Sequence, residues 1–127
     1  MGGYYNENEL IEIIDDFTSK YKAMDSIPYK KHLQQKLGVT KITLARYAKK
    51  YPKAFEHMNL TAKQMIVRHA LQGKMKHDKA LFLLIKNYDN ESIGGIVANQ
   101  IRFSKRFELR DILISYGRAI GLQITEL

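Results

Sequence analysis

Apolar residues recur at the spacing of an α-helix along most of the chain, and this periodicity restricts the fold more than any other feature. The first such segment is expected to form a helix from about Asn8 to Tyr21, with one apolar face made of Leu10, Ile13, Ile14, Phe17 and Tyr21. We expect further helices over residues 29–37, 40–50, 61–73, 78–88, 92–103 and 107–120, with a short helical turn over 52–57. The periodicity therefore predicts an all-α protein.

Residues that favour helix ends set the expected boundaries. Gly38 is expected to end the helix over 29–37, and Thr40 to cap the next one. Asn59 and Leu60 are expected to form a connector, because Thr61-Ala62-Lys63-Gln64 fits a capping box that would open a new helix. Two regions follow from this pattern: residues 1–58, which include the first three expected helices, and residues 59–127, a helical core or oligomerisation region.

The C-terminal region is expected to contain a helical hairpin, a last helix and a short extended tail. The hairpin would join the helix that ends at Gly73 to the helix that starts at Asp78, and Gly121 would cap the last helix. Residues 122–127 alternate in polarity like a strand, so they would either pair with another chain or form an extended tail.

Composition excludes several classes of protein. The chain has 127 residues and no Cys, which argues against a disulfide framework and favours a reducing compartment. Its longest apolar run, residues 80–85, is far too short to span a membrane, and its start lacks the pattern of a signal peptide. We therefore expect one small cytoplasmic protein without a membrane partner.

The charge of the chain is unevenly distributed. The net charge is +8 at pH 7, but residues 1–28 carry six acidic and two basic side chains. Residues 29–86 carry fourteen basic side chains and only two acidic ones, and residues 87–127 carry five of each. A block with net charge +12 indicates a polyanionic partner, with nucleic acid as the first candidate and an acidic membrane surface as the second.

The segment Leu33 to Tyr47 lies inside this basic block and resembles a DNA-binding helix-turn-helix. Leu33 and Leu37 would face inward on the first helix, and Gly38 would allow the sharp turn. Val39 would fill the angle between the helices, and two further apolar residues would hold the second helix in place: Leu44 and Tyr47.

The opposite face of the second helix is expected to meet DNA. Its candidate DNA-binding residues are Thr40, Lys41, Ile42, Thr43, Arg46, Lys49 and Lys50. Arg46 suits a bidentate contact to guanine, Thr43 a base edge or a phosphate, and Ile42 a thymine methyl group. Lys49 and Lys50 are better placed for phosphates, together with three lysines of the preceding helix: Lys30, Lys31 and Lys36.

The segment from Ala70 to Tyr88 is similar to the central helical hairpin of small terminase subunits, the DNA-packaging proteins of tailed phages. It has a glycine turn at Gly73 and an apolar segment that ends in Leu84-Ile85-Lys86-Asn87, with an inserted Ile relative to the family pattern. The resemblance covers roughly residues 29–90. It implies binding of viral duplex DNA, a ring of identical subunits and a large ATPase subunit as partner, in the cytoplasm of a bacterial host.

Two other functions fit the same residues. A phage or prophage transcriptional regulator would bind paired half-sites as a dimer. A protein-interaction module would use the apolar segment over 80–85 against an acidic or helical partner.

The sequence offers no pattern for catalysis or for a cofactor. The four histidines, His32, His57, His69 and His77, lack metal-ligand spacing, and no phosphate-binding loop for ATP is present. The carboxylates Glu12, Asp15 and Asp16 are expected to lie on the first helix with no His or Arg beside them. We therefore expect a protein that is not an enzyme and binds no metal.

Overall fold

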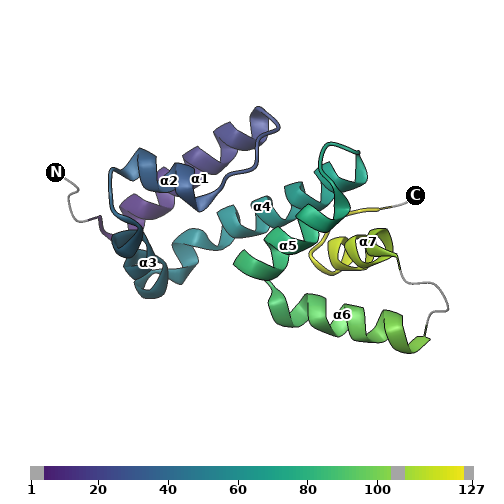
Figure 1. Ribbon diagram of the computed structural model, residues 1–127. Helices are drawn as coiled ribbons and strands as arrows, with labels where there is room; N and C mark the ends of the chain where they lie inside the picture. Colours follow the sequence, from purple (N-terminus) through teal and green to yellow (C-terminus); the bar gives the residue numbers. More distant parts are fainter. Residues whose placement is uncertain (1–4, 104–107, 125–127) are drawn as a thin grey trace. The chain divides into compact units, whose positions relative to one another are not determined.

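The structure is a computed structural model that describes residues 5–103 and 108–124. Within these ranges it contains only α-helices and no strand (Figure 1). The helices are α1 (Glu7–Ala23), α2 (Lys30–Leu37), α3 (Lys41–Lys50), α4 (Pro52–Leu71), α5 (His77–Asn87), α6 (Asn90–Phe103) and α7 (Leu109–Ala119). The prediction of an all-α fold is confirmed.

The chain divides into two compact units, Met1–Ala62 and Lys63–Leu127. The division lies inside α4, so this helix contributes its first part to unit 1 and its last part to unit 2. The boundary expected from the sequence lay nearby, between residues 58 and 59.

Helix α1 begins at a reciprocal pair of hydrogen bonds. The Glu9 backbone N–H donates to Asn6 Oδ1 at 2.8 Å, and the Asn6 backbone N–H donates to Glu9 Oε1 at 3.1 Å. This capping box satisfies two N–H groups that have no partner within the helix. It explains why α1 starts at Glu7, slightly before the expected position.

Unit 1 has a single apolar core made by α1, α2, α3 and the start of α4. Large side chains with almost no exposed surface lie at its centre, each stabilising the fold by about 1.5–3 kcal/mol relative to an exposed position. The core residues are Leu10, Ile14, Phe17, Leu33, Leu37, Leu44, Tyr47, Ala54, Phe55 and Met58.

Helix α4 is continuous, and the expected connector at Asn59 and Leu60 is wrong. Met58 and Ala62 are fully buried in the middle of the helix, and Thr61 is 5% exposed. Thr61 therefore lies inside α4 and opens no new helix. A buried apolar face without Gly or Pro sustains the helix, so burial overrides the local capping pattern.

In unit 2, helices α5, α6 and α7 pack against one another. Ile93 of α6 and two α7 residues, Ile112 and Leu113, are buried almost completely. Gly117 of α7 lies in close contact with its surroundings: a Cβ atom at this position would lie 2.9 Å from Val67 Cγ1 and 2.8 Å from Ile124 Cδ1. The absence of a side chain at Gly117 therefore allows α7 to approach these residues.

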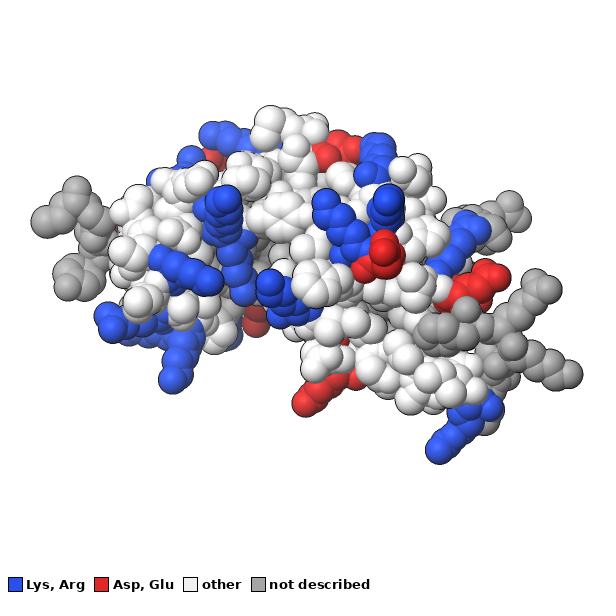
Figure 2. All heavy atoms as spheres, in the orientation of Figure 1, with Lys and Arg blue, Asp and Glu red and all other residues white. Residues whose placement is uncertain are grey.

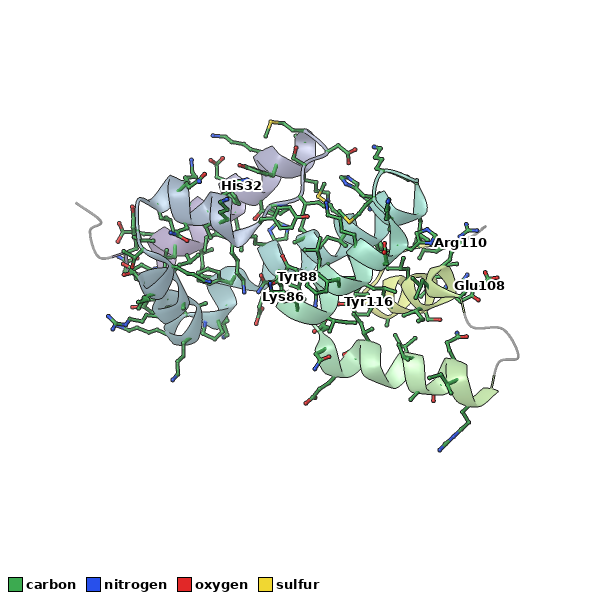
Figure 3. The ribbon with its side chains drawn as sticks, in the orientation of Figure 1. His32, Lys86, Tyr88, Glu108, Arg110 and Tyr116 are labelled. Carbon is green, nitrogen blue, oxygen red and sulfur yellow. The ribbon has the colours of Figure 1, made fainter. Side chains whose placement is uncertain are left out.

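A polar cluster crosses unit 2 at the start of α6. Lys63 Nζ donates a hydrogen bond to Asp89 Oδ2 at 2.9 Å, and the Tyr116 phenol donates to the same oxygen. Tyr116 is 1% exposed and lies on α7 (Figure 3). Because the three residues come from different parts of unit 2, the cluster ties α4, the start of α6 and α7 together.

Some helices of unit 2 begin at other residues than the sequence predicted. α5 begins at His77, so Asp78 lies in its first turn and does not cap it. α6 runs through Gly94 and Gly95, and α7 is described from Leu109, while Phe107 lies outside the described residues.

Two of the glycines that were expected to follow helices adopt the left-handed conformation. Gly73 and Gly121 have φ angles of 79° and 92°, as a glycine that follows a helix permits. Residues 122–124 are not part of a strand, and the rest of the expected tail, 125–127, lies outside the described residues. No helix among the described residues combines the length and the apolar character that crossing a bilayer requires.

Candidate nucleic-acid interface

A three-residue turn joins α2 to α3. Gly38 adopts a left-handed conformation, with φ 67° and ψ 32°, and its N–H donates to the Gln34 carbonyl at 3.0 Å. The Val39 N–H donates to the same carbonyl at 3.3 Å. No atom lies within 4 Å of a Cβ built on Gly38, so its backbone conformation and not a lack of space favours glycine here.

Helix α3 starts at a side-chain cap. The Thr43 N–H donates to Thr40 Oγ1 at 3.1 Å, and the Thr40 hydroxyl donates to Thr43 Oγ1 at 3.0 Å. Thr40 is exposed, whereas Thr43 is half-buried. Both hydroxyls therefore support the start of the helix, and the hydroxyl proton of Thr43 remains available for a further acceptor.

Helix α3 has one buried face and one exposed face. Leu44 and Tyr47 are buried, while Ile42, Arg46 and Lys49 follow one another at the i, i+4, i+7 spacing of the opposite face. Ile42 is 67% exposed and therefore contributes little to the core. On the face drawn in Figure 2, Lys and Arg side chains project from the part of unit 1 that holds α3.

The remaining predicted DNA-binding residues lie on α2, in the turn and on α3. Lys41 and Lys50 are exposed on α3, and Lys50 Nζ lies 5.2 Å from the centroid of the Tyr51 ring. All three predicted lysines of α2 are exposed as well: Lys30, Lys31 and Lys36. The ten predicted residues thus lie on three consecutive segments of unit 1, namely α2, the turn and α3, and all but Thr43 are exposed.

Tyr5 supports the turn, a role that no sequence pattern indicated. The Tyr5 phenol donates to the Leu37 carbonyl at 3.3 Å, and the Tyr5 N–H donates to Tyr47 Oη at 3.1 Å. The two tyrosine rings meet edge to face, with centroids 6.1 Å apart. Tyr5 therefore contacts the last residue of α2 and the buried face of α3, which fixes one helix relative to the other.

The sequence indicated no His beside the acidic residues of α1, and for Asp15 this expectation is wrong. His57 of α4 lies beside Asp15, with Nδ1 3.3 Å from Asp15 Oδ1. Sequence spacing gave no signal for this pair, because 42 residues separate its members. Both side chains are about half exposed, so the pair links α1 to α4 at the surface and forms no enclosed catalytic site.

His32 lies on the inner side of α2 in an aromatic environment (Figure 3). Its ring stacks on Tyr21 at 5.5 Å between centroids, and its buried Nδ1 has no hydrogen-bond partner. Among the residues that the structure describes, no group of three His, Asp or Glu side chains could hold a metal ion. His32 therefore contributes to packing between α1 and α2.

Comparisons with protein-family models, with curated proteins and with solved structures find no match to this chain. The case for a function therefore depends on the geometry and charge of the surface described above.

Proposed function

We propose that unit 1 binds duplex DNA in a sequence-directed manner, with α3 in the major groove. The observation that carries the proposal is the exposed stripe of α3, which offers Arg46 between Ile42 and Lys49 on the face opposite the core. A DNA-binding helix of this kind reads base edges with such a face.

Each residue of this surface has a role that its chemistry suits. Arg46 makes a bidentate contact to a guanine, and Ile42 contacts a thymine methyl group. The surrounding lysines neutralise phosphates, which orients the protein on the duplex without specifying sequence.

Substitutions at Arg46 separate base reading from charge. The wild-type chain is first used to select a preferred site from a randomised duplex pool. Arg46→Ala then lowers the preference for that site by about 5- to 150-fold, which corresponds to about 1–3 kcal/mol for a bidentate contact. Arg46→Lys keeps the charge but loses the planar fork, so most of the preference is lost while binding to random DNA persists.

An exposed, uncharged residue of α2 provides the matched control. Gln35→Ala leaves both affinity and preference unchanged, because the side chain points to solvent and carries no charge. Wild-type protein that binds no duplex at low salt, or an Arg46→Ala variant with an unchanged site preference, would contradict the proposal.

We further propose a role in phage DNA packaging, as the resemblance to small terminase subunits implies. In this role the chain is not an enzyme: it forms a homo-oligomer on viral DNA and presents that DNA to a large ATPase subunit in the host cytoplasm. Native mass spectrometry with and without duplex DNA distinguishes this role from that of a dimeric regulator. A ring of many subunits supports packaging, whereas a dimer contradicts it.

A further inference from the structure

Unit 2 carries basic charge that the proposed role of α3 does not use. Residues 63–127 have eleven basic and six acidic side chains, a net charge of +5, while residues 1–62 have ten and seven, a net charge of +3. The acidic helix α1 offsets much of the charge of unit 1. The larger excess of positive charge therefore lies in the unit without the helix-turn-helix.

This excess is concentrated between the end of α4 and the end of α5. Residues 74–86 contain four lysines and a single acidic residue, Asp78. Asp78 Oδ1 accepts a hydrogen bond from the Lys79 backbone N–H at 2.8 Å, which engages one of its oxygens at the helix start. The local field of the segment therefore remains positive.

The periodicity of α5 places two of these lysines on one exposed face. Lys79 and Lys86 are separated by seven residues, or about two turns, and both are exposed, whereas Ala80 and Leu84 on the opposite face are fully buried. Lys76, the residue directly before α5, is exposed as well. We call Lys76, Lys79 and Lys86 the α5 lysine stripe.

Phe82 lies within this stripe and is 60% exposed. Lys86 Nζ is 5.5 Å from the centroid of its ring, a cation–π contact that restricts where the ammonium group lies. Figure 3 labels Lys86 near the end of α5. Because the Phe82 side chain remains exposed between lysines, packing in the core does not explain why an aromatic residue lies here.

We propose that the α5 lysine stripe is a second DNA contact, which binds the phosphate backbone of a duplex without reading its sequence. The rise of an α-helix separates Lys79 from Lys86 by about 10 Å along the axis, roughly the rise of three base pairs. The two ammonium groups can therefore neutralise different phosphates. The proposal extends the proposed function, since it assigns a second contact with the same kind of ligand.

The test compares two double variants of the full chain in binding to a random-sequence duplex across a range of salt concentrations. Lys79→Gln with Lys86→Gln lowers affinity by on the order of 10-fold per lysine at 0.1 M salt and reduces the salt slope by about 1.8. Lys20→Gln with Lys22→Gln removes the same charge from exposed positions of α1 and leaves both quantities nearly unchanged. Circular dichroism confirms that both variants remain folded.

The outcomes separate this proposal from the role of α3. If the α5 variant binds like the wild type while Arg46→Ala loses site preference, the second contact is wrong and the role of α3 stands. If the α5 variant weakens binding to all duplexes while Arg46→Ala keeps its preference, the second contact stands and the role of α3 is wrong. The α5 variant could instead lose self-association while its DNA binding is unchanged. This result would mean that the stripe binds an acidic surface of a second copy, and it would overturn the proposal.

Discussion

The Tyr116 phenol and the Lys63 ammonium donate to the same oxygen of Asp89, which leaves this carboxylate as the shared acceptor of a polar cluster inside a helical unit. Removing the acceptor deprives both donors of their partner at once. The cost of a buried donor without a partner is larger than the gain from making the bond, which makes Asp89 the most sensitive member of the cluster.

Replacing Asp89 by Ala is expected to destabilise unit 2 by about 2–3 kcal/mol, because it leaves a buried phenol and a largely buried ammonium group unpaired. Tyr116→Phe removes one donor and costs about 1 kcal/mol. The free energy of unfolding in urea measures the loss in each variant. Hydrogen exchange at the amides of α6 and α7 shows whether the loss lies in unit 2. Equal losses for the two variants would contradict the role of Asp89 as shared acceptor.

The same cluster predicts a dependence of stability on pH. Burial raises the pKa of Asp89, but hydrogen bonds from Tyr116 and Lys63 and the charge of Lys63 outweigh it and hold the pKa below 3.8. A carboxyl group with a lowered folded-state pKa stabilises the fold above its unfolded-state pKa, and this contribution is lost as the pH falls through the folded-state value. The wild type therefore loses stability below about pH 4 more steeply than Asp89→Asn does.

Unfolding curves between pH 6 and pH 2.5 test this expectation. Asp16→Asn serves as the control, because Asp16 is exposed and pairs with Lys20 only at the surface. Its free energy of unfolding at pH 6 is expected to lie close to that of the wild type, because a surface ion pair contributes little. Parallel profiles for Asp89→Asn and the wild type would refute the prediction.

At alkaline pH the corresponding group is Tyr116. Burial, together with the hydrogen bond to Asp89, raises the pKa of Tyr116 well above its usual value of 10.0. The neutral phenol thus contributes stability that is complete below pH 10 and decreases at higher pH. Absorbance titration of the tyrosines tests this expectation, because Tyr116→Phe should remove a phenol that ionises well above pH 10.

Gly38→Ala is expected to cost about 1 kcal/mol, because an L-residue in the left-handed region is strained even where space is free. For a unit of this size the midpoint of thermal unfolding falls by about 4–8 °C. Gly38→Asn costs less, since Asn tolerates this conformation better than Ala. An Ala variant as stable as the wild type would show that the turn adopts another conformation.

Gly117→Ala tests the close approach of α7. Alanine favours a helix over glycine by up to about 1 kcal/mol, but the added Cβ meets Val67 and Ile124 at less than 3 Å. Overpacking of this kind costs about 1–3 kcal/mol, so net destabilisation is expected in thermal unfolding. Gly95→Ala is the matched control: nothing lies within 4 Å of its Cβ, and the same substitution in α6 is expected to stabilise.

The sequence predicted α1, α2 and α3 to within two residues at each end because the local signals agreed. Apolar periodicity, Gly38 and Thr40 all indicated the same boundaries for α2 and α3. At Thr61 the signals conflicted: a capping pattern indicated a new helix, while the apolar residues around it continued the face of α4. Helix α4 continues through Thr61 because its apolar face is buried by tertiary packing. A local sequence pattern carries no information about such burial.

The contacts that hold the candidate site and the polar cluster could not be predicted. Tyr5 reaches Tyr47 across 42 residues, and Asp89 reaches Tyr116 across 27. Neither pair has a signature in sequence spacing, because each depends on how distant helices pack. The exposure of Phe82 could not be predicted either, because an apolar run does not show which of its side chains face solvent.

The contact between Tyr5 and Tyr47 also has a consequence for the order of assembly during synthesis. The turn between α2 and α3 closes through hydrogen bonds between near neighbours, which form quickly once that segment has left the ribosome. Tyr5 emerges before both of its hydrogen-bond partners, Leu37 and Tyr47, and the second of these belongs to α3. Tyr5 is therefore expected to dock only after α3 has formed, so a residue made before the turn completes this part of unit 1 after it.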